Sequence, residues 1–123
     1  MTLQELYTLI DGDYNRAVQI MKMDRLIGRY IQKFPNSGVN EALQAAGESM
    51  DPVRLFESAH AMKGVCANMG LVKLADMVSA LTEEFRAGNA RRMSDEEVRA
   101  VIADVDALYR RTVEGIRQYE STL

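Results

Sequence analysis

The sequence has few of the residues on which metal sites, disulfides and membrane spans depend. Its 123 residues include one cysteine, one histidine and no tryptophan. A single cysteine cannot form an internal disulfide, so we expect a cytoplasmic protein in a reducing compartment. One histidine and one cysteine offer no cluster of metal ligands. No apolar run approaches the roughly 20 residues that span a bilayer, and residues 1–5 lack the basic and apolar regions of a secretory signal.

The motifs of common enzyme classes are absent as well. The chain contains no P-loop, no Gly-x-Gly-x-x-Gly and no Gly-x-Ser-x-Gly elbow. Glu57 precedes His60 by three residues, but a di-iron helical bundle requires more than one such pair. The net charge of -3 is too mild to predict nucleic-acid binding. We therefore expect a protein without an ATP site, without autonomous catalysis and without a bound metal or other cofactor.

The hydrophobic pattern predicts helices throughout, because no segment sustains the alternation typical of strands. A possible capping box of Thr2 and Glu5 begins a short helix that runs to about Ile10. Longer helices are expected over 13–34, 40–48, 52–69, 71–86 and 95–119. Most of their ends carry recognised signals, namely the N-caps Asp13, Asp51 and Ser94, Pro52 at a first helical position, and Pro35, Gly70 and Gly88 as stops.

Long amphipathic helices joined by short loops favour antiparallel neighbours. The predicted fold is therefore all-α, an antiparallel up-and-down four-helix bundle with short N-terminal helical segments that cover one end. A chain of this length suits a single domain over 1–123. In the 13–34 helix we expect an apolar stripe of Val18, Met21, Leu26, Tyr30 and Phe34.

His60 lies on the side of its helix that faces away from the expected core. At about 100° per residue, one arc of the helix holds the apolar stripe Leu55, Ala59, Met62, Cys66 and Met69. On the same wheel His60 points about 140° away from Leu55, towards water. A lone exposed histidine is most often an ordinary surface residue, so its neighbours must decide whether it has a role.

Those neighbours favour phosphoryl transfer. Free imidazole has a pKa of about 6.5, so much of it is neutral and nucleophilic near neutral pH. Lys63, one turn after His60, can place its ammonium near phosphoryl oxygens. Gly64 costs about 1 kcal/mol against alanine inside a helix, and its missing side chain leaves room for a partner at the imidazole. Ala67 extends that room, and Phe56 adds an apolar element for partner docking.

The run His60-Ala61-Met62-Lys63-Gly64, followed by Asn68-Met69-Gly70-Leu71 and Leu74, resembles the signature of the histidine-containing phosphotransfer (HPt) family. That family is a four-helix bundle of about this length. The resemblance implies that His60 is the phospho-acceptor, Lys63 the charge partner and Gly64 the clearance residue. It also implies a phosphorelay intermediate that takes a phosphoryl group from a receiver-domain aspartate and passes it to another.

The resemblance further implies the partners. These are the receiver domains of a hybrid sensor histidine kinase and of a response regulator, and the receivers supply Mg²⁺ and the catalytic residues. A monomer is expected. The alternative is a regulatory or adaptor bundle that binds a receiver domain or kinase without carrying phosphate. Two further expectations concern ordinary roles: Cys66 as a buried core thiol, and Arg91 and Arg92 as solvated loop residues.

Overall fold

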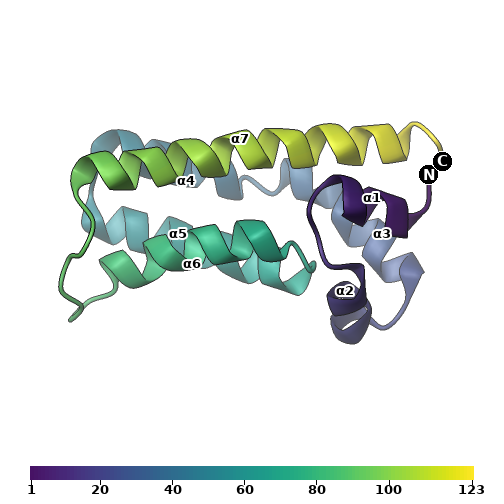
Figure 1. The fold of residues 1–123 in the computed structure, drawn as a ribbon, viewed down its shortest axis with the longest axis horizontal. Coiled ribbons are helices and arrows are strands. Elements are labelled where there is room, and N and C mark those ends of the chain that lie inside the picture. Colours follow the sequence, from purple (N-terminus) through teal and green to yellow (C-terminus); the bar gives the residue numbers. More distant parts are fainter.

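The computed structural model describes all residues from 1 to 123 and contains helices but no strands, as Figure 1 shows, so the all-α prediction is confirmed. In chain order the elements are α1 (Leu3–Leu9), α2 (Tyr14–Met21), α3 (Asp24–Lys33), the short 3-10 helix η1 (Phe34–Asn36), α4 (Val39–Ser49), α5 (Pro52–Asn68), α6 (Val72–Phe85) and α7 (Asp95–Glu120). No helix combines the length and the apolar character needed to cross a membrane.

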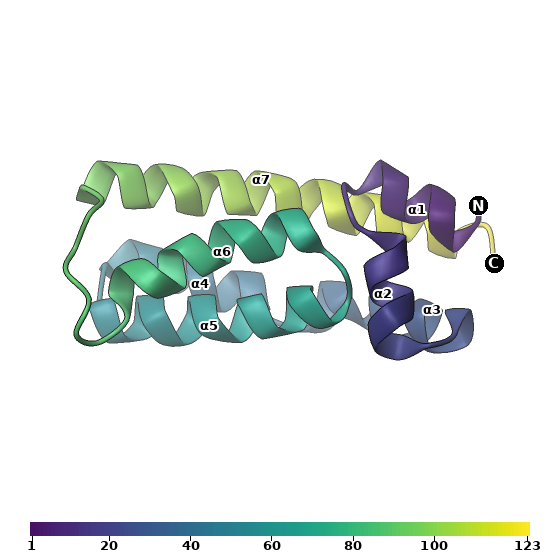
Figure 2. The same ribbon diagram turned by 60° about the horizontal axis from the view of Figure 1, so that its bottom comes forward.

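Four helices form the body of the molecule. Helix α5 packs against α4 and α6, and the long α7 packs against the same two helices (Figure 2). One continuous cluster of buried apolar side chains fills the space between them and extends beneath the N-terminal helices. The stripe predicted for the helix that carries His60 belongs to this cluster, because Leu55, Ala59, Met62, Cys66 and Met69 are all buried.

The predicted caps are present and set the helix boundaries. The side chains of Thr2 and Glu5, and those of Ser94 and Glu97, form complete capping boxes at the starts of α1 and α7. Asp51 accepts a hydrogen bond from the backbone N–H of Val53, at 3.1 Å, and so caps α5. These bonds satisfy backbone donors that lack a partner in the first turn of a helix.

The long helix predicted over 13–34 is wrong. The chain breaks into α2 and α3 at Lys22, whose φ of 73° lies in the left-handed region. The break lets each half turn its own apolar face to the core, so the predicted stripe is also wrong in α3. Ile27 and Ile31 are fully buried there, whereas Tyr30 is 49% exposed.

The N-terminal helices cover one end of the four-helix body, as expected (Figure 1). The Tyr7 hydroxyl donates to the carbonyl of Met69 at 2.7 Å, and the backbone N–H of Asp13 donates to the carbonyl of Gly70 at 2.8 Å. Gly70 has a φ of 70°, and a Cβ there would lie 2.6 Å from the carbonyl oxygen of Asp13. The turn between α5 and α6 is therefore fixed by the N-terminal segment.

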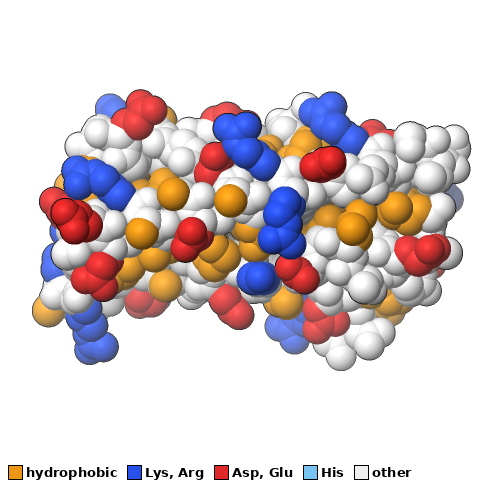
Figure 3. All heavy atoms as spheres, turned by 45° about the horizontal axis from the view of Figure 1, so that its top comes forward, with side chains coloured by type: hydrophobic (Ala, Val, Ile, Leu, Met, Phe, Trp, Pro, Cys, Tyr) orange, Lys and Arg blue, Asp and Glu red, His pale blue; other side chains and the backbone are white.

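The face on which α7 comes forward is mixed in character. Figure 3 shows charged side chains of both signs, interspersed with small hydrophobic areas. Such a surface is normal for a folded protein and marks no site by itself. The residues singled out in the sequence belong to α5, which runs below α7 in the view of Figure 1.

Candidate functional site

His60 is exposed on α5, as the helical geometry predicts. The residue before it, Ala59, is fully buried, and so is Met62 two positions later. Because the core holds both neighbours, the helix cannot rotate His60 inward without exposing apolar side chains. The imidazole is therefore presented to solvent by a helix that is fixed in its rotation.

The surface one turn beyond His60 is open. A Cβ built on Gly64 would meet no atom within 4 Å, so no part of this chain requires glycine there. Ala67, a further turn along, is exposed and small. A glycine inside a helix costs stability relative to alanine, and the structure offers no internal packing reason for it. The space is available to a second molecule that approaches the imidazole.

On the other side of His60 stands an aromatic ring. Phe56, one turn earlier on α5, is half-buried and packs parallel to the imidazole, with ring centroids 5.5 Å apart and an interplanar angle of 8°. Stacked rings of this kind restrict one another's rotation. The predicted docking residue thus also holds the orientation of the imidazole.

A cation from the next helix reaches this ring. The guanidinium carbon of Arg86 lies 5.2 Å from the centroid of Phe56. Arg86 follows the end of α6 and also pairs with Glu83 on that helix, at 3.1 Å between Nη2 and Oε1. The position of Arg86 beside Phe56 could not be predicted from the sequence, because no spacing along the chain relates the two residues.

Lys63 is half-buried on α5, one turn after His60. Its positive charge lowers the pKa of Glu83, which lies on the neighbouring helix α6. The bond from Arg86 lowers the pKa of Glu83 most, against the effect of desolvation, and the charges of Arg86 and Lys63 lower it further. The two cations Lys63 and Arg86 therefore both act on the carboxylate of Glu83.

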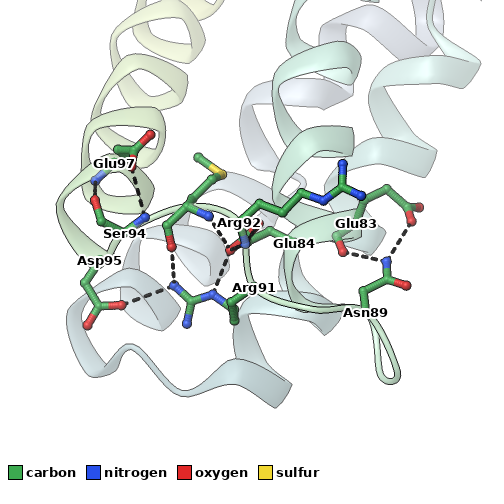
Figure 4. A network of polar contacts seen from close by, with 9 residues as sticks. Glu83, Glu84, Asn89, Arg91, Arg92, Ser94, Asp95 and Glu97 are labelled. Carbon is green, nitrogen blue, oxygen red and sulfur yellow. Dashed lines mark hydrogen bonds and ion pairs between the residues drawn. The ribbon is translucent and has the colours of Figure 1, made fainter.

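The loop after α6 is held by a buried carboxylate, shown in Figure 4. Glu84 has a side chain only 4% exposed, and its oxygens accept from the backbone N–H groups of Arg92 and Met93 at 2.9 to 3.1 Å. Arg91 donates to it at 2.7 Å and to Asp95 at 3.2 Å. Arg91 and Arg92 are both exposed, as predicted, but Arg91 also forms an ion pair with Glu84 that the sequence did not predict.

Cys66 takes no part in this surface. It is fully buried on the core side of α5, and burial raises the pKa of its thiol to about 12. A thiol with so high a pKa carries little thiolate at neutral pH and is a poor nucleophile. The prediction of a core thiol is confirmed for this residue.

The comparisons with known proteins agree with this geometry. The family model of the Hpt domain matches residues 36–111, which include α4 to α6 and more than half of α7. The chain belongs to the Hpt domain family. Hpt domains are phosphocarrier modules of two-component phosphorelays, and His60 lies within the matched part. Comparison with curated proteins and with solved structures found no match.

The Hpt match leaves the first 35 residues outside it. Those residues form α1 to α3 and most of the short turn that follows. The predicted site residues Phe56, His60, Lys63, Gly64 and Ala67 all lie on α5, within the matched part. The structure adds Glu83 and Arg86 to the same surface from the neighbouring helix.

Proposed function

We propose that this chain is a phosphorelay intermediate in which His60 is the phospho-acceptor. One observation supports it most: in an Hpt domain, the single histidine is exposed beside the open space at Gly64. The donor is an aspartyl phosphate of one receiver domain, and the acceptor is an aspartate of another. Helices α4 to α7 would be the antiparallel bundle that presents the imidazole, and residues 1–123 would act as one unit.

The transfer itself needs little chemistry from this chain. The lone pair of the unprotonated ring nitrogen forms a bond to phosphorus while the bond between phosphorus and the aspartate oxygen breaks. The carboxylate leaves with that electron pair, and the proton on the other ring nitrogen can pass to solvent. In the second transfer, the carboxylate of another receiver aspartate attacks phosphorus, and the bond between phosphorus and the imidazole nitrogen breaks. Because phosphoryl transfer depends on positioning and charge neutralisation, the remaining demands are geometric and electrostatic.

The neighbours of His60 fit those demands. Phe56 restricts the rotation of the imidazole, and Gly64 with Ala67 leaves space for the receiver. Lys63 can neutralise charge on the phosphoryl oxygens from one turn away. Mg²⁺ would be held by the receiver domain, where it neutralises the charge of the same group.

The test is transfer from a phosphorylated receiver domain, in the presence of Mg²⁺, to the wild-type chain and to His60→Gln. The wild type should gain an acid-labile, base-stable phosphoryl group, as phosphohistidine does. The His60→Gln variant should remain unlabelled while its circular dichroism and receiver binding are unchanged, because His60 is exposed and the substitution removes no core contact.

Two outcomes would contradict the proposal. Labelling that persists in His60→Gln would place the phosphoryl group on another residue. A wild-type chain that binds receivers but is never labelled by any of them would instead be an adaptor bundle.

A further inference from the structure

Glu83 lies on α6 and forms an ion pair with Arg86, which contacts the Phe56 ring beside His60. Its side chain is 51% exposed and receives three contacts from Arg86, at 3.1 to 3.3 Å. Asn89 donates to the backbone carbonyl of Glu83 at 2.8 Å and reaches its carboxylate at 3.4 Å, as Figure 4 shows. The carboxylate is therefore held in one place although it faces solvent.

Arg86 links this carboxylate to the imidazole surface. Its guanidinium contacts Glu83 and at the same time lies 5.2 Å from the centroid of Phe56, which stacks on His60. A guanidinium placed over an aromatic ring keeps its full charge and its hydrogen-bond donors. Arg86 and the imidazole thus contact the same phenyl ring, and the Arg86 side chain is 42% exposed.

Lys63 lies on α5, which packs against α6, the helix of Glu83. Its positive charge acts on Glu83 across the helix pair, after the larger effects of the Arg86 bond, desolvation and the Arg86 charge. No carboxylate forms an ion pair with Lys63 within 4.0 Å, and the two cations have Glu83 as their shared negative neighbour. In the unphosphorylated chain Glu83 therefore pairs with Arg86, and Lys63 is left without an ion pair.

We propose that Glu83 is a resident counter-ion for Lys63 and Arg86, and that a phosphoryl group on His60 displaces it. The inference rests on His60 being the phospho-acceptor. A phosphoryl group carries between one and two negative charges near neutral pH, more than one carboxylate. An exposed ion pair is weak and exchanges readily. When His60 is loaded, Arg86 can therefore leave Glu83, and Lys63 can turn to the phosphoryl oxygens.

The carboxylate of Glu83 lowers the stability of phosphohistidine at His60. It competes with the phosphoryl group for both cations and repels that group, so it disfavours the loaded state of His60. A carrier that bound its phosphoryl group too well would not release it to the next aspartate. Glu83 thus keeps the transfer reversible by limiting the stability of phosphohistidine.

The experiment compares the equilibrium of phosphoryl groups between this chain and a receiver domain for the wild type and Glu83→Gln. The variant should shift that equilibrium towards phosphohistidine by about two- to fivefold, as expected for an exposed charge. Arg86→Gln should shift it the other way. Both shifts should shrink near 1 M salt, where the screening length is about 3 Å.

Glu114→Gln on α7 is the matched control. It removes the same charge from an exposed glutamate that forms no ion pair, and it should leave the equilibrium unchanged. If Glu83→Gln behaves like Glu114→Gln, or shifts the equilibrium towards the receiver, Glu83 is not a competing counter-ion and the inference is overturned.

A second measurement needs no receiver and separates this inference from the proposed function. Potassium phosphoramidate phosphorylates histidine directly, and the Nε–H signal of Arg86 can then be followed by NMR, assigned through Arg86→Lys. Loading of His60 should move this signal more than those of the arginines on α3. A signal that does not move overturns the displacement of Glu83, even if receivers exchange phosphoryl groups with His60. If the Arg86 signal moves but no receiver domain exchanges phosphoryl groups with His60, the displacement of Glu83 is supported and the proposed phosphorelay function is rejected.

Discussion

His60 is placed by residues one turn before and one turn after it on the same helix. Phe56 stacks on one side of the imidazole, and Gly64 leaves the other side open. These positions follow from the helical repeat, so the sequence was enough to predict them. The contribution of Arg86 was not predictable, because it depends on how α6 lies against α5 rather than on any local spacing.

At the residue scale, Gly64→Ala should separate stability from transfer. A Cβ at this position meets nothing, and alanine is favoured over glycine inside a helix, so the free energy of unfolding should rise by about 0.5–1 kcal/mol. Transfer to a receiver should become slower, because the added methyl group narrows the approach to the imidazole. Urea unfolding and rapid-quench transfer assays measure the two effects.

The larger substitution Gly64→Gln should slow transfer further, by about 10- to 100-fold if it displaces the reacting atoms by an ångström. Its free energy of unfolding should equal or exceed that of the wild type, since glutamine is a better helix former than glycine and the space at Gly64 is open. Transfer rates equal to those of the wild type would show that the space at Gly64 is not used by the partner.

At the scale of elements, caps were predictable and the geometry of the breaks was not. Thr2, Asp51 and Ser94 are strong N-cap types in sequence and act as caps in the structure. Lys22 gives no such signal, because lysine is not a residue that favours the left-handed conformation it adopts between α2 and α3. The sequence also did not predict that, of the two adjacent glutamates at the end of α6, Glu83 is exposed and Glu84 is buried.

Glu84 joins the end of α6 to the start of α7, and its replacement should loosen that connection. Burial alone would raise the pKa of Glu84, but the bonds from Met93, Arg91 and Arg92 outweigh it and lower the pKa below the ordinary 4.5. At neutral pH, Glu84→Gln should lower the free energy of unfolding by about 1.5–3 kcal/mol, the range for hydrogen bonds to a charged group.

The pH dependence of this difference has a definite sign. Because the pKa of Glu84 is lower in the folded state, the unfolded state binds more protons between the two values, and stability increases with pH there. The advantage of the wild type over Glu84→Gln is thus complete above the ordinary pKa and should disappear as the pH falls through the folded value. Urea titrations from pH 7 to pH 3 measure it, with Glu114→Gln as the control that should show no such change. A difference independent of pH would mean that the charge of Glu84 does not hold the loop.

At the scale of the whole molecule, the N-terminal helices and the matched Hpt region form one continuous core. Helix α1 packs against α7 close to Gly115, where a Cβ would lie 2.6 Å from Cγ2 of Ile10. The all-α class and the covered end were predictable from helical patterning. The contact at Gly115 was not, because it joins segments about a hundred residues apart, and nothing in a local pattern relates them.

Gly115→Ala should therefore destabilise the molecule by about 1–3 kcal/mol, the usual cost of overpacking. Transfer through His60 should be unchanged in the folded protein, because α1 meets α7 rather than the imidazole surface of α5. Thermal unfolding and the transfer assay test this together. Gly64→Ala is the matched control, since the same methyl group added in open space should stabilise. A loss of transfer without a loss of stability would contradict the separation of the two regions.

The parallel stack of Phe56 on His60 has a spectroscopic consequence. Electrons that circulate in the phenyl ring shift the resonances of nearby nuclei, so the carbon-bound protons of the imidazole should resonate away from their free positions. The chain has one histidine, and these protons therefore give the only imidazole signals in a proton spectrum. Any event that tilts or separates the two rings changes the ring-current shift. The imidazole signals of His60 thus report on the orientation of this side chain without an added label.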